Sequence, residues 1–265
     1  MSSAKEVSVL ALHGFTGCGD DFLGFSEKCK LISNWYCPNL PGHHEGTENN
    51  ANIIKCDPTS TRLFLQNYIK NISPSPKLLL GYSMGARAAL HLALDSTNDW
   101  RALILISPNT GIKEEHDRKI RREEDHKLAD RIEIEGTSRF IKHWKETPLI
   151  KSQKNIRADW RKRMQEGREQ HSPLGLATSL REFGQGNCPY LLDKLNIIKM
   201  PVLILTGLND KKYCKIASQI CERLTHAEHV AINNTGHMPH LERPDESSKI
   251  IDRFISKIGF YNKYK

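Results

Sequence analysis

The fold is decided by the stretch Lys77-Leu78-Leu79-Leu80-Gly81-Tyr82-Ser83-Met84-Gly85-Ala86-Arg87-Ala88-Ala89-Leu90. An apolar run ends at Gly81, Ser83 lies between two glycines, and helix-forming residues follow at once. This pattern predicts a strand, a sharp turn and a helix, with Ser83 at the apex as a nucleophile. Gly81 and Gly85 suit such a turn because the serine backbone is strained there, and because strand and helix must approach closely. A purely structural serine is the alternative.

The composition is that of an ordinary folded protein of 265 residues, of which 38% are apolar and 26% are charged. A chain of this length can bury a full core as one domain, or as one domain with an insertion. No apolar run resembles a signal peptide or reaches membrane-spanning length, so we expect no membrane insertion. The seven cysteines are scattered and never in Cys-x-x-Cys spacing, so we expect reduced thiols in a cytoplasmic protein rather than disulfides or a zinc site.

The formal net charge is +8, from 39 Lys and Arg against 31 Asp and Glu. The basic residues are interspersed with acidic ones and no recognition motif accompanies them, so we expect no nucleic-acid partner. A basic surface also attracts small anions.

A buried strand is predicted near the start of the chain, where residues 7–12 form an apolar and partly β-branched run. The loop His13-Gly14-Phe15 follows, and a helix is expected from about 20 to 31. Enzymes with a nucleophile elbow place half of their oxyanion hole in such a loop. We therefore expect the oxyanion donors to be the backbone N–H groups of Phe15 and of Met84, which follows the serine. The alternative is a glycine-rich surface turn.

A short strand at 35–37 leads into a loop that contains His43-His44-Glu45. These three residues are consecutive, lack the helical spacing of a zinc motif and have no obvious further ligand, so we expect no metal site. The next helix is expected at 59–71, with the core-facing residues Leu63, Tyr68 and Ile69.

An α/β architecture with an inserted helical cap is predicted by the order of the elements. Strands and helices alternate up to a buried strand at 102–107, which indicates a mostly parallel central sheet with helices on both faces. From 108 to 198 no strand-like run appears, and helices are expected at 113–135, 137–146, 154–168 and 173–183. We therefore expect a core formed by 1–107 and 199–265, with 108–198 as a cap, or lid. Most charges of the cap are expected to form a solvated face with i,i+4 pairs.

The partners of Ser83 are expected after the cap. An apolar strand at 201–207 runs into Asp210, which has the position of a triad acid after a late strand. His237 follows the last strand in a Gly-His-x-x-His-Leu-Glu sequence and is the natural base, with His240 as its competitor. The order Ser83, Asp210, His237 is typical of the α/β-hydrolase fold.

This triad supports two reaction types. His237, oriented by the carboxylate of Asp210, can take the proton of Ser83 Oγ. The serine can then attack a carbonyl, or act only as a base beside a carbonyl whose enolate the oxyanion hole stabilises. The triad alone does not distinguish a hydrolase from a lyase, although it disfavours a catalytically inactive binding module. Arg87, one helical turn after Ser83, is expected to lean toward the site and to bind a substrate carboxylate, with pairing to a surface acid as the alternative.

Motifs of one known family recur nearly end to end in the chain, at Leu12 to Gly17, Pro38 to His43, Gly81 to Arg87, Trp144 to Leu149, Gly175 to Arg181, Gly207 to Tyr213 and Gly236 to Pro244. The chain thus resembles the 2-succinyl-6-hydroxy-2,4-cyclohexadiene-1-carboxylate synthases, menaquinone-pathway members of the α/β-hydrolase fold. The elbow, Asp and His motifs are common to the whole fold. Tyr82, Arg87, the Trp-x-x-x-Pro-Leu of the cap and the Gly-Leu-Ala-x-Ser-Leu-Arg stretch are more particular to this family.

The resemblance implies a carbon–oxygen lyase that eliminates pyruvate from 2-succinyl-5-enolpyruvyl-6-hydroxy-3-cyclohexene-1-carboxylate. The triad would abstract a proton α to the succinyl ketone, and no cofactor is implied. The substrate carries three carboxylates, and by position in the motifs its pocket is expected to be lined by Tyr82, Arg87, Arg121, Trp144, Arg168 and Lys212. For the cap arginine the register within Arg121-Arg122 stays open.

Two residues depart from the family pattern. His44 stands where the family usually has Gly, and Ala86 replaces a frequent second Gly after the elbow. Ala86 is a small change at a helix start, whereas His44 can alter the loop or the fit of the substrate. A serine hydrolase of a small ester, thioester or C–C bond therefore stays as the alternative function, and the chain is expected to be a monomer or a small homo-oligomer.

Overall fold

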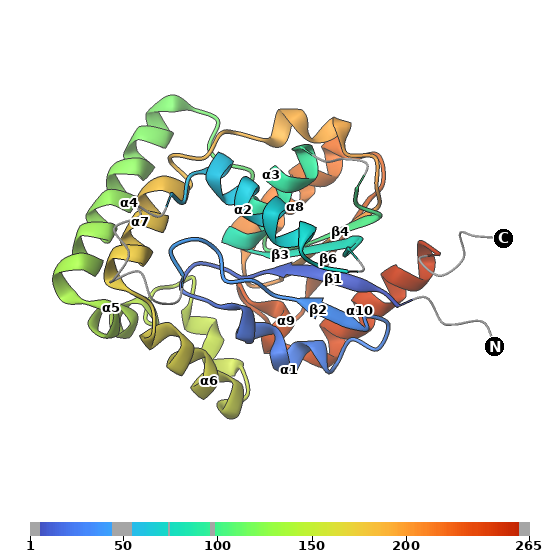
Figure 1. Cartoon of the computed structure of the whole chain (residues 1–265), viewed down its shortest axis with the longest axis horizontal. Helices are drawn as coiled ribbons and strands as arrows, with labels where there is room; N and C mark the ends of the chain where they lie inside the picture. The colour runs from blue at the N-terminus through green and yellow to red at the C-terminus, as the bar shows by residue number, and fades with distance from the viewer. Residues whose placement is uncertain (1–5, 44–54, 74, 96–98, 260–265) are drawn as a thin grey trace.

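The computed structural model describes residues 6–43, 55–73, 75–95 and 99–259 of the chain. Its centre is a parallel sheet with the strand order β2-β1-β3-β4-β5-β6 (Figure 1). The strands are β1 (Ser8–Leu12), β2 (Asn34–Tyr36), β3 (Leu78–Tyr82), β4 (Ala102–Ile106), β5 (Val202–Gly207) and β6 (Ala227–Ile232). Four of them, β1, β3, β4 and β5, are buried along their whole length, which explains their continuous apolar sequences.

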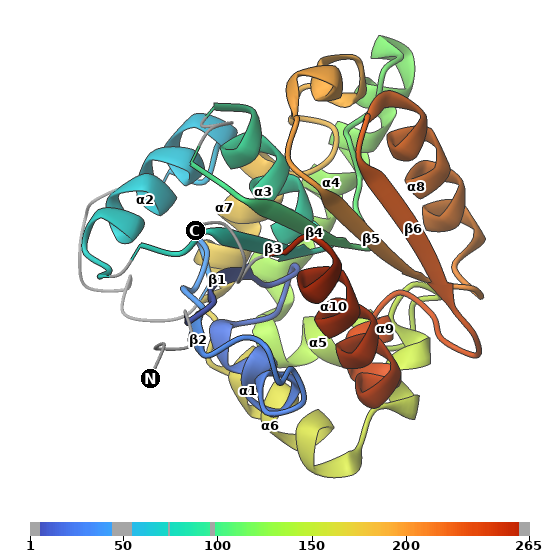
Figure 2. The ribbon, with the colours of Figure 1, turned by 90° about the vertical axis from the view of Figure 1, so that its right-hand side faces the viewer.

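Helices cover both faces of this sheet (Figure 2), which confirms the predicted fold class. On one face lie α2 (Pro58–Lys70), α3 (Met84–Asp95), the 3₁₀ helix η3 (Leu192–Ile197) and α8 (Lys211–Arg223). On the other face lie η1 (Gly19–Phe22), α1 (Leu23–Ser26), α9 (Pro239–Glu242) and α10 (Pro244–Lys257). Each face has its own apolar core, the first containing Leu90 and Ile220 and the second containing Phe25 and Phe254.

Between β4 and β5, the chain up to Phe183 forms a separate group of helices at one side of the sheet (Figure 1). It consists of α4 (Glu115–Glu135), α5 (Thr137–Trp144), η2 (Lys151–Asn155), α6 (Ala158–Glu169) and α7 (Pro173–Phe183). A third apolar cluster holds α4, α5 and α7 together through residues that include Ile132, Phe140 and Leu176. We call this segment the cap. None of the helices in the described ranges combines the length and the apolar character needed to cross a membrane.

The segment expected to be one helix from 20 to 31 is different in the structure. It consists of η1 and the four-residue α1, which ends at Ser26. After it, the backbone N–H groups of Lys30 and Leu31 donate to the carboxylate of Asp252 in α10, at 3.0 and 3.1 Å. A side chain from a distant helix thus takes the place of the helical acceptors, which the local sequence does not show.

The buried face of α2 is also different from the expected one. Leu63 is 49% exposed, whereas Thr61 and Leu65, four residues apart, are buried. Tyr68 and Ile69 are partly buried against the core as expected. The prediction was wrong at Leu63 because a polar residue, Thr61, occupies a buried position and its hydroxyl donates to the Cys56 carbonyl.

The carboxyl ends of the parallel strands all reach one edge of the sheet, and the loops that leave them converge there. These loops hold residues 13–17 after β1, Ser83 after β3, 208–210 after β5 and 233–238 after β6. In an open parallel sheet this edge is where ligands bind, so the fold alone brings the predicted site residues together.

Candidate active site

Ser83 occupies a strained turn between β3 and α3. Its φ angle is +52°, in the left-handed region that non-glycine residues rarely adopt, and its N–H donates to the Ile106 carbonyl at 2.9 Å. A Cβ atom at Gly85 would lie 2.1 Å from the Leu12 carbonyl oxygen, and one at Gly81 would lie 2.4 Å from the Gly85 carbonyl oxygen. The two glycines are therefore required by the close approach of strand and helix that presents the Ser83 hydroxyl.

Ser83, His237 and Asp210 form a continuous hydrogen-bonded chain. His237 Nε2 lies 2.9 Å from Ser83 Oγ, and His237 Nδ1 lies 2.7 Å from Asp210 Oδ2. The His237 side chain is 2% exposed and that of Asp210 is 11% exposed, so water screens this pair little. With Nδ1–H donating to the carboxylate, Nε2 is free to accept the hydroxyl proton of Ser83, which is the requirement for general-base activation.

Tyr213, in the first turn of α8, fixes the acid and the base from the side. Its backbone N–H donates to Asp210 Oδ1 at 3.4 Å, and its ring packs edge-on against the His237 ring at 4.3 Å between centroids. Sequence analysis assigned no role to Tyr213. The signal for it is its place three residues after Asp210, where a helix begins and its free N–H groups point at the preceding carboxylate.

Glu242 holds the loop that carries His237, and sequence analysis missed it as well. Its buried carboxylate accepts hydrogen bonds from the backbone N–H of Gly236 at 2.8 Å and of Met238 at 3.2 Å, on either side of the histidine. It also accepts a bond from Ser152 Oγ of the cap at 2.9 Å. Three donors, two of them backbone groups, thus converge on one carboxylate behind the base.

His240, the competing candidate for the base, points away from Ser83 into the core. It is 1% exposed, and its ring packs against those of Tyr82, Phe22 and Phe25. Burial, together with the neighbouring His237, lowers the pKa of His240 to about 3, so the ring stays neutral. The geometry therefore favours His237 as the base.

The loop after β1 lies against the elbow, and the two predicted oxyanion donors lie beside Ser83. Phe15 and Met84 both line the cavity that contains Ser83, and no acceptor among the described residues pairs with their backbone N–H groups. A Cβ atom at Gly14 would lie 2.7 Å from the Tyr82 ring, so only glycine lets the loop approach this closely. The imidazole of His43 accepts the N–H of Thr16 at 3.3 Å and helps to fix the loop.

The cavity above Ser83 has a volume of about 220 Å³ and is roofed by the cap. Its walls from the core include Phe15, Met84, Arg87 and Tyr213, and those from the cap include Arg121, Trp144 and Phe183. A smaller cavity of about 30 Å³ shares Phe15, Ser83 and Trp144 with it and adds Tyr82, Arg168 and His237. We call the two together the catalytic chamber. Of the six residues predicted to line the pocket, five lie around it.

Arg87 is 5% exposed and faces the chamber. One amino group donates to the Phe183 carbonyl of the cap at 2.5 Å, and the guanidinium lies 5.0 Å from the centre of the Phe183 ring. Its Nε atom is buried without a partner among the described residues. The alternative of a surface ion pair is wrong, and a buried cation with a spare donor is available to an anion in the chamber.

The two cap arginines differ in how they are held. Arg121 pairs with Asp125 at 2.8 Å and donates to Gln185 at 3.1 Å, whereas Arg122 pairs with Glu115 and does not line the chamber. Of the two neighbouring arginines, Arg121 is therefore the one that lines the chamber.

Arg168 is 7% exposed and donates to Gln153 Oε1 at 2.8 Å, while its Nε has no partner among the described residues. Burial raises the pKa of the nearby Asp21 to about 6 in spite of the opposing charge of Arg168. Burial also raises the pKa of Tyr82 well above its usual range, so its hydroxyl stays protonated. These groups give the small end of the chamber a protonated phenol, a cation and a carboxylate that is more basic than usual.

Lys212 is exposed on α8, with its amino group 5.9 Å from the Tyr213 ring centre, and it does not line the chamber. Ala86 is fully buried in α3 and does not line it either. His44 lies outside the described residues, as does Glu45. No group of three or more His, Cys, Asp or Glu side chains within the described ranges is arranged to hold a metal ion.

Comparison with known proteins identifies the family. The model of the α/β-hydrolase fold family matches residues 7–244. A Bacillus subtilis protein, provisionally named 2-succinyl-6-hydroxy-2,4-cyclohexadiene-1-carboxylate synthase, is 32% identical over 95% of this chain and 91% of that protein. The chain belongs to this synthase family of the α/β-hydrolase fold.

Other members of the family agree. The Photorhabdus laumondii protein named 2-succinyl-6-hydroxy-2,4-cyclohexadiene-1-carboxylate synthase is 25% identical over 92% of the chain and 84% of its own length. The solved structure of MenH from S. aureus superposes with a TM-score of 0.87 at 30% identity, over 95% of this chain and 94% of that one. An esterase structure from Thermogutta terrifontis, at 21% identity and a TM-score of 0.76, is similar in fold alone. The resemblance inferred from the motifs is confirmed.

Proposed function

We propose that the chain eliminates pyruvate from 2-succinyl-5-enolpyruvyl-6-hydroxy-3-cyclohexene-1-carboxylate and so forms 2-succinyl-6-hydroxy-2,4-cyclohexadiene-1-carboxylate in menaquinone biosynthesis. The names of its relatives support this reaction. The observation that carries the proposal is a chamber in which two buried arginines, without ion pairs in the described part of the chain, lie beside an ordered serine, histidine and aspartate, although Asp21, Glu124 and Asp125 also line it. Arg87 and Arg168 both face it, and neither forms an ion pair within the described residues.

In this mechanism Ser83 acts as a base. His237 Nε2 takes the hydroxyl proton, and Ser83 Oγ removes the proton α to the succinyl ketone. The electrons of the broken C–H bond form an enolate whose oxygen accepts hydrogen bonds from the N–H groups of Phe15 and Met84. Collapse of the enolate through the ring double bond breaks the C–O bond. The released enolpyruvate takes the proton of the His237 imidazolium and becomes pyruvate, while Ser83 keeps the proton that it removed from the substrate. Asp210 stabilises the imidazolium between these steps.

The binding roles follow from the walls of the chamber. We assign the three substrate carboxylates to the cations Arg87, Arg121 and Arg168, because a guanidinium binds a carboxylate through two parallel hydrogen bonds. Trp144 and the protonated Tyr82 supply the apolar wall and a donor for the ring. Lys212 is exposed outside the chamber, so we limit its contribution to electrostatic attraction of the anionic substrate.

A serine hydrolase would use the same three residues through an acyl-enzyme. The comparisons do not favour it, because the relatives similar over nearly the whole chain bear the synthase name.

The test is pyruvate release from the enolpyruvyl substrate by the purified protein, with Ser83→Ala as the inactive control. We expect release that depends on Ser83, and a fall of about 100-fold in kcat/KM for Arg87→Ala against no change for Arg139→Ala, an exposed arginine of α5. Thermal unfolding shows whether the variants stay folded. Absence of release, together with burst turnover of p-nitrophenyl acetate, would replace the lyase by the hydrolase.

A further inference from the structure

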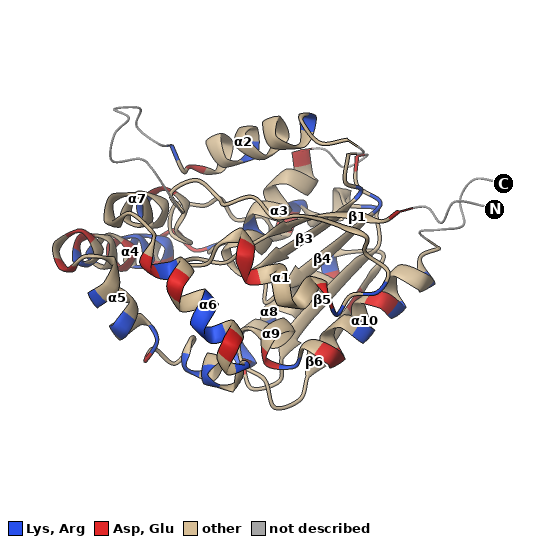
Figure 3. Ribbon diagram, turned by 60° about the horizontal axis from the view of Figure 1, so that its bottom comes forward, with Lys and Arg blue, Asp and Glu red and all other residues tan. Residues whose placement is uncertain are grey.

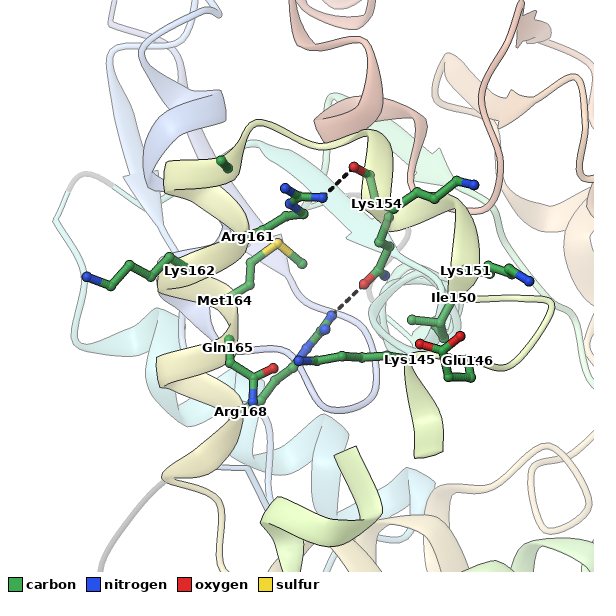
Figure 4. Close-up of a pocket in the computed structure, with 12 residues that line it drawn as sticks. Lys145, Glu146, Ile150, Lys151, Lys154, Arg161, Lys162, Met164, Gln165 and Arg168 are labelled. Atoms are coloured by element: carbon green, nitrogen blue, oxygen red, sulfur yellow. Dashed lines mark hydrogen bonds between the residues drawn. The ribbon is translucent and has the colours of Figure 1, made fainter. Parts of the chain in front are cut away.

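The cap contains a second and larger cavity, of about 450 Å³, between α6 and the segment from the end of α5 through η2 (Figure 4). Six of its twelve lining residues are Lys or Arg and only one, Glu146, is acidic. Figure 3 shows ribbon coloured for Lys and Arg on α5, on α6 and along their connection, together with acidic segments on α6. A concave surface with charges of one sign focuses the field on its interior, so anions are concentrated there.

This cavity adjoins the catalytic chamber. Ile150, Gln153 and Arg168 line both this cavity and the small end of the chamber, which also contains Ser83 and His237. Arg168 lies between them, 93% buried, with one amino group on Gln153 and with Nε unpartnered. A buried cation that is only partly satisfied, at the junction of two cavities, is available to an anion on either side.

Among the six cations that line this cavity, Lys162 alone forms an ion pair within the described ranges, with Glu166 at 3.9 Å. Within the described ranges Lys145, Arg161 and Arg168 form no ion pair, and Arg161 donates instead to the Lys154 carbonyl. Figure 4 shows Lys145 extending toward Arg168, with Arg161 on the wall above them, whereas Lys162 points outward. Partial burial lowers the pKa of Lys145, and so does the charge of Arg168.

Charged surfaces elsewhere in the cap are different. On α4 and α7 the arginines have acidic partners, as Arg121 has Asp125, Arg131 has Glu135, and Arg181 has Asp130 and Glu133. A face needed only for solvation has this mixed pattern. Of the six cations that line the cavity beside α6, five have no acidic partner in the described ranges, so solvation alone does not explain the charge of this cavity.

We propose that this cavity is a carboxylate-binding vestibule, in which Lys145, Arg161 and Arg168 hold a small di- or tricarboxylate beside the chamber. The assignment of a carboxylate as the ligand rests on the proposed function. The vestibule holds the incoming substrate through its carboxylates. Because Arg168 belongs to both sites, it can stay bound to a carboxylate while the substrate leaves Lys145 and Arg161 and enters the chamber.

The binding test uses the full chain labelled with ¹⁵N and tricarballylate as the probe. The side-chain amide of Gln165 lines only the vestibule, and that of Gln185 lines only the chamber, so two separate signals report on the two sites. We expect saturable shifts of the Gln165 signal in the wild type. In the double variant Lys145→Gln/Arg161→Gln the apparent Kd from this signal should rise about tenfold, while that from Gln185 changes little.

The matched control is Lys70→Gln/Lys77→Gln, which removes the same charge from exposed lysines at the opposite edge of the sheet. It should leave both affinities unchanged. If the Arg161 substitution disturbs folding in thermal unfolding, Lys145→Gln alone replaces the double variant, with an expected rise of about threefold. Shifts at Gln185 alone, shifts at Gln165 that rise linearly without saturating, or equal effects of vestibule and control variants would each overturn the vestibule.

The kinetic test separates this inference from the proposed function. For pyruvate release we expect Lys145→Gln/Arg161→Gln to lower kcat/KM about fivefold at low salt, with kcat unchanged and a weaker salt dependence than the control variant. An active wild type whose salt dependence is the same in both variants would overturn the vestibule and leave the proposed function intact. An inactive wild type would overturn the proposed function, and the binding test would still decide the vestibule.

Discussion

Replacing Glu242 by Gln tests whether the cap stabilises the catalytic loop. The carboxylate accepts three hydrogen bonds, from the N–H groups of Gly236 and Met238 and from Ser152 Oγ. Two of these reach Oε1 and one reaches Oε2. In glutamine, the amide oxygen can replace Oε1 and keep the hydrogen bonds from Ser152 and Met238. The amide NH₂ group then replaces Oε2 and faces the Gly236 N–H, so two donors point at each other.

The magnitude follows from these contacts. A hydrogen bond to a charged acceptor contributes about 1.5–3 kcal/mol and a neutral one about 0.5–1.5 kcal/mol, while a buried donor without a partner costs about 1–3 kcal/mol. Glu242→Gln loses one bond, weakens two and leaves the Gly236 N–H unpaired. We therefore expect the free energy of unfolding to fall by about 3–5 kcal/mol. Because the two backbone donors flank His237, we also expect kcat to fall about 10- to 100-fold.

The assay is urea unfolding at constant pH, combined with the rate of pyruvate release. Glu246→Gln is the matched control, since it removes an exposed carboxylate a few residues along the chain. Ser152→Ala, which removes only the cap donor, should cost about 1–2 kcal/mol. A Glu242→Gln protein as stable and as active as the Glu246→Gln protein would refute the reasoning.

Four further variants test other parts of the molecule. Asp210→Asn leaves the hydrogen-bonding shape but not the charge, so kcat for pyruvate release should fall about 10⁴-fold with the fold intact; a fall below tenfold would remove Asp210 from the mechanism. Gly85→Ala places a Cβ 2.1 Å from the Leu12 carbonyl oxygen and should lower the unfolding free energy by more than about 3 kcal/mol. Gly136→Ala, with no neighbouring atom but a φ of +77°, should cost only about 1–2 kcal/mol, and equal losses would contradict the steric argument. The pKa of His240 is about 3 in the folded state against an ordinary 6.5, so the unfolded state binds the extra proton and stability falls as pH drops through this window. The free energy of unfolding, measured in urea, should therefore decrease between pH 6.5 and 5 by about 2 kcal/mol less in His240→Phe than in the wild type. The same pH profile in both proteins would argue against this role of His240.

The residues that the sequence predicted best are those whose role is local. Ser83 is marked by a turn whose glycines have a steric reason, and Asp210 and His237 by their places directly after strands. Once the strands are parallel, their carboxyl ends meet, so these positions predict proximity without any knowledge of packing.

Contacts between distant segments could not be predicted in this way. In the sequence nothing distinguishes Glu242 from an ordinary helical glutamate. Its role depends on contacts with a cap serine and with the loop around His237, which only the folded structure shows. Lys212 was predicted to line the pocket because of its position in the motif. In α8 the side chain of Tyr213 is buried, and its neighbour Lys212 is exposed. A motif fixes position along the chain, whereas the direction of a side chain depends on the helix phase.

The contacts between cap and core have a consequence for protein engineering. Ser152 and Phe183 of the cap bond to Glu242 and Arg87 of the core. The inserted helices thus help to hold the loop that carries His237 and the arginine of α3 that faces the chamber. A chimera that exchanges only the cap for that of another family member would exchange these supports together with the substrate walls. Transplanting selectivity between such enzymes therefore requires that the core partners be moved as well, as one unit with the cap.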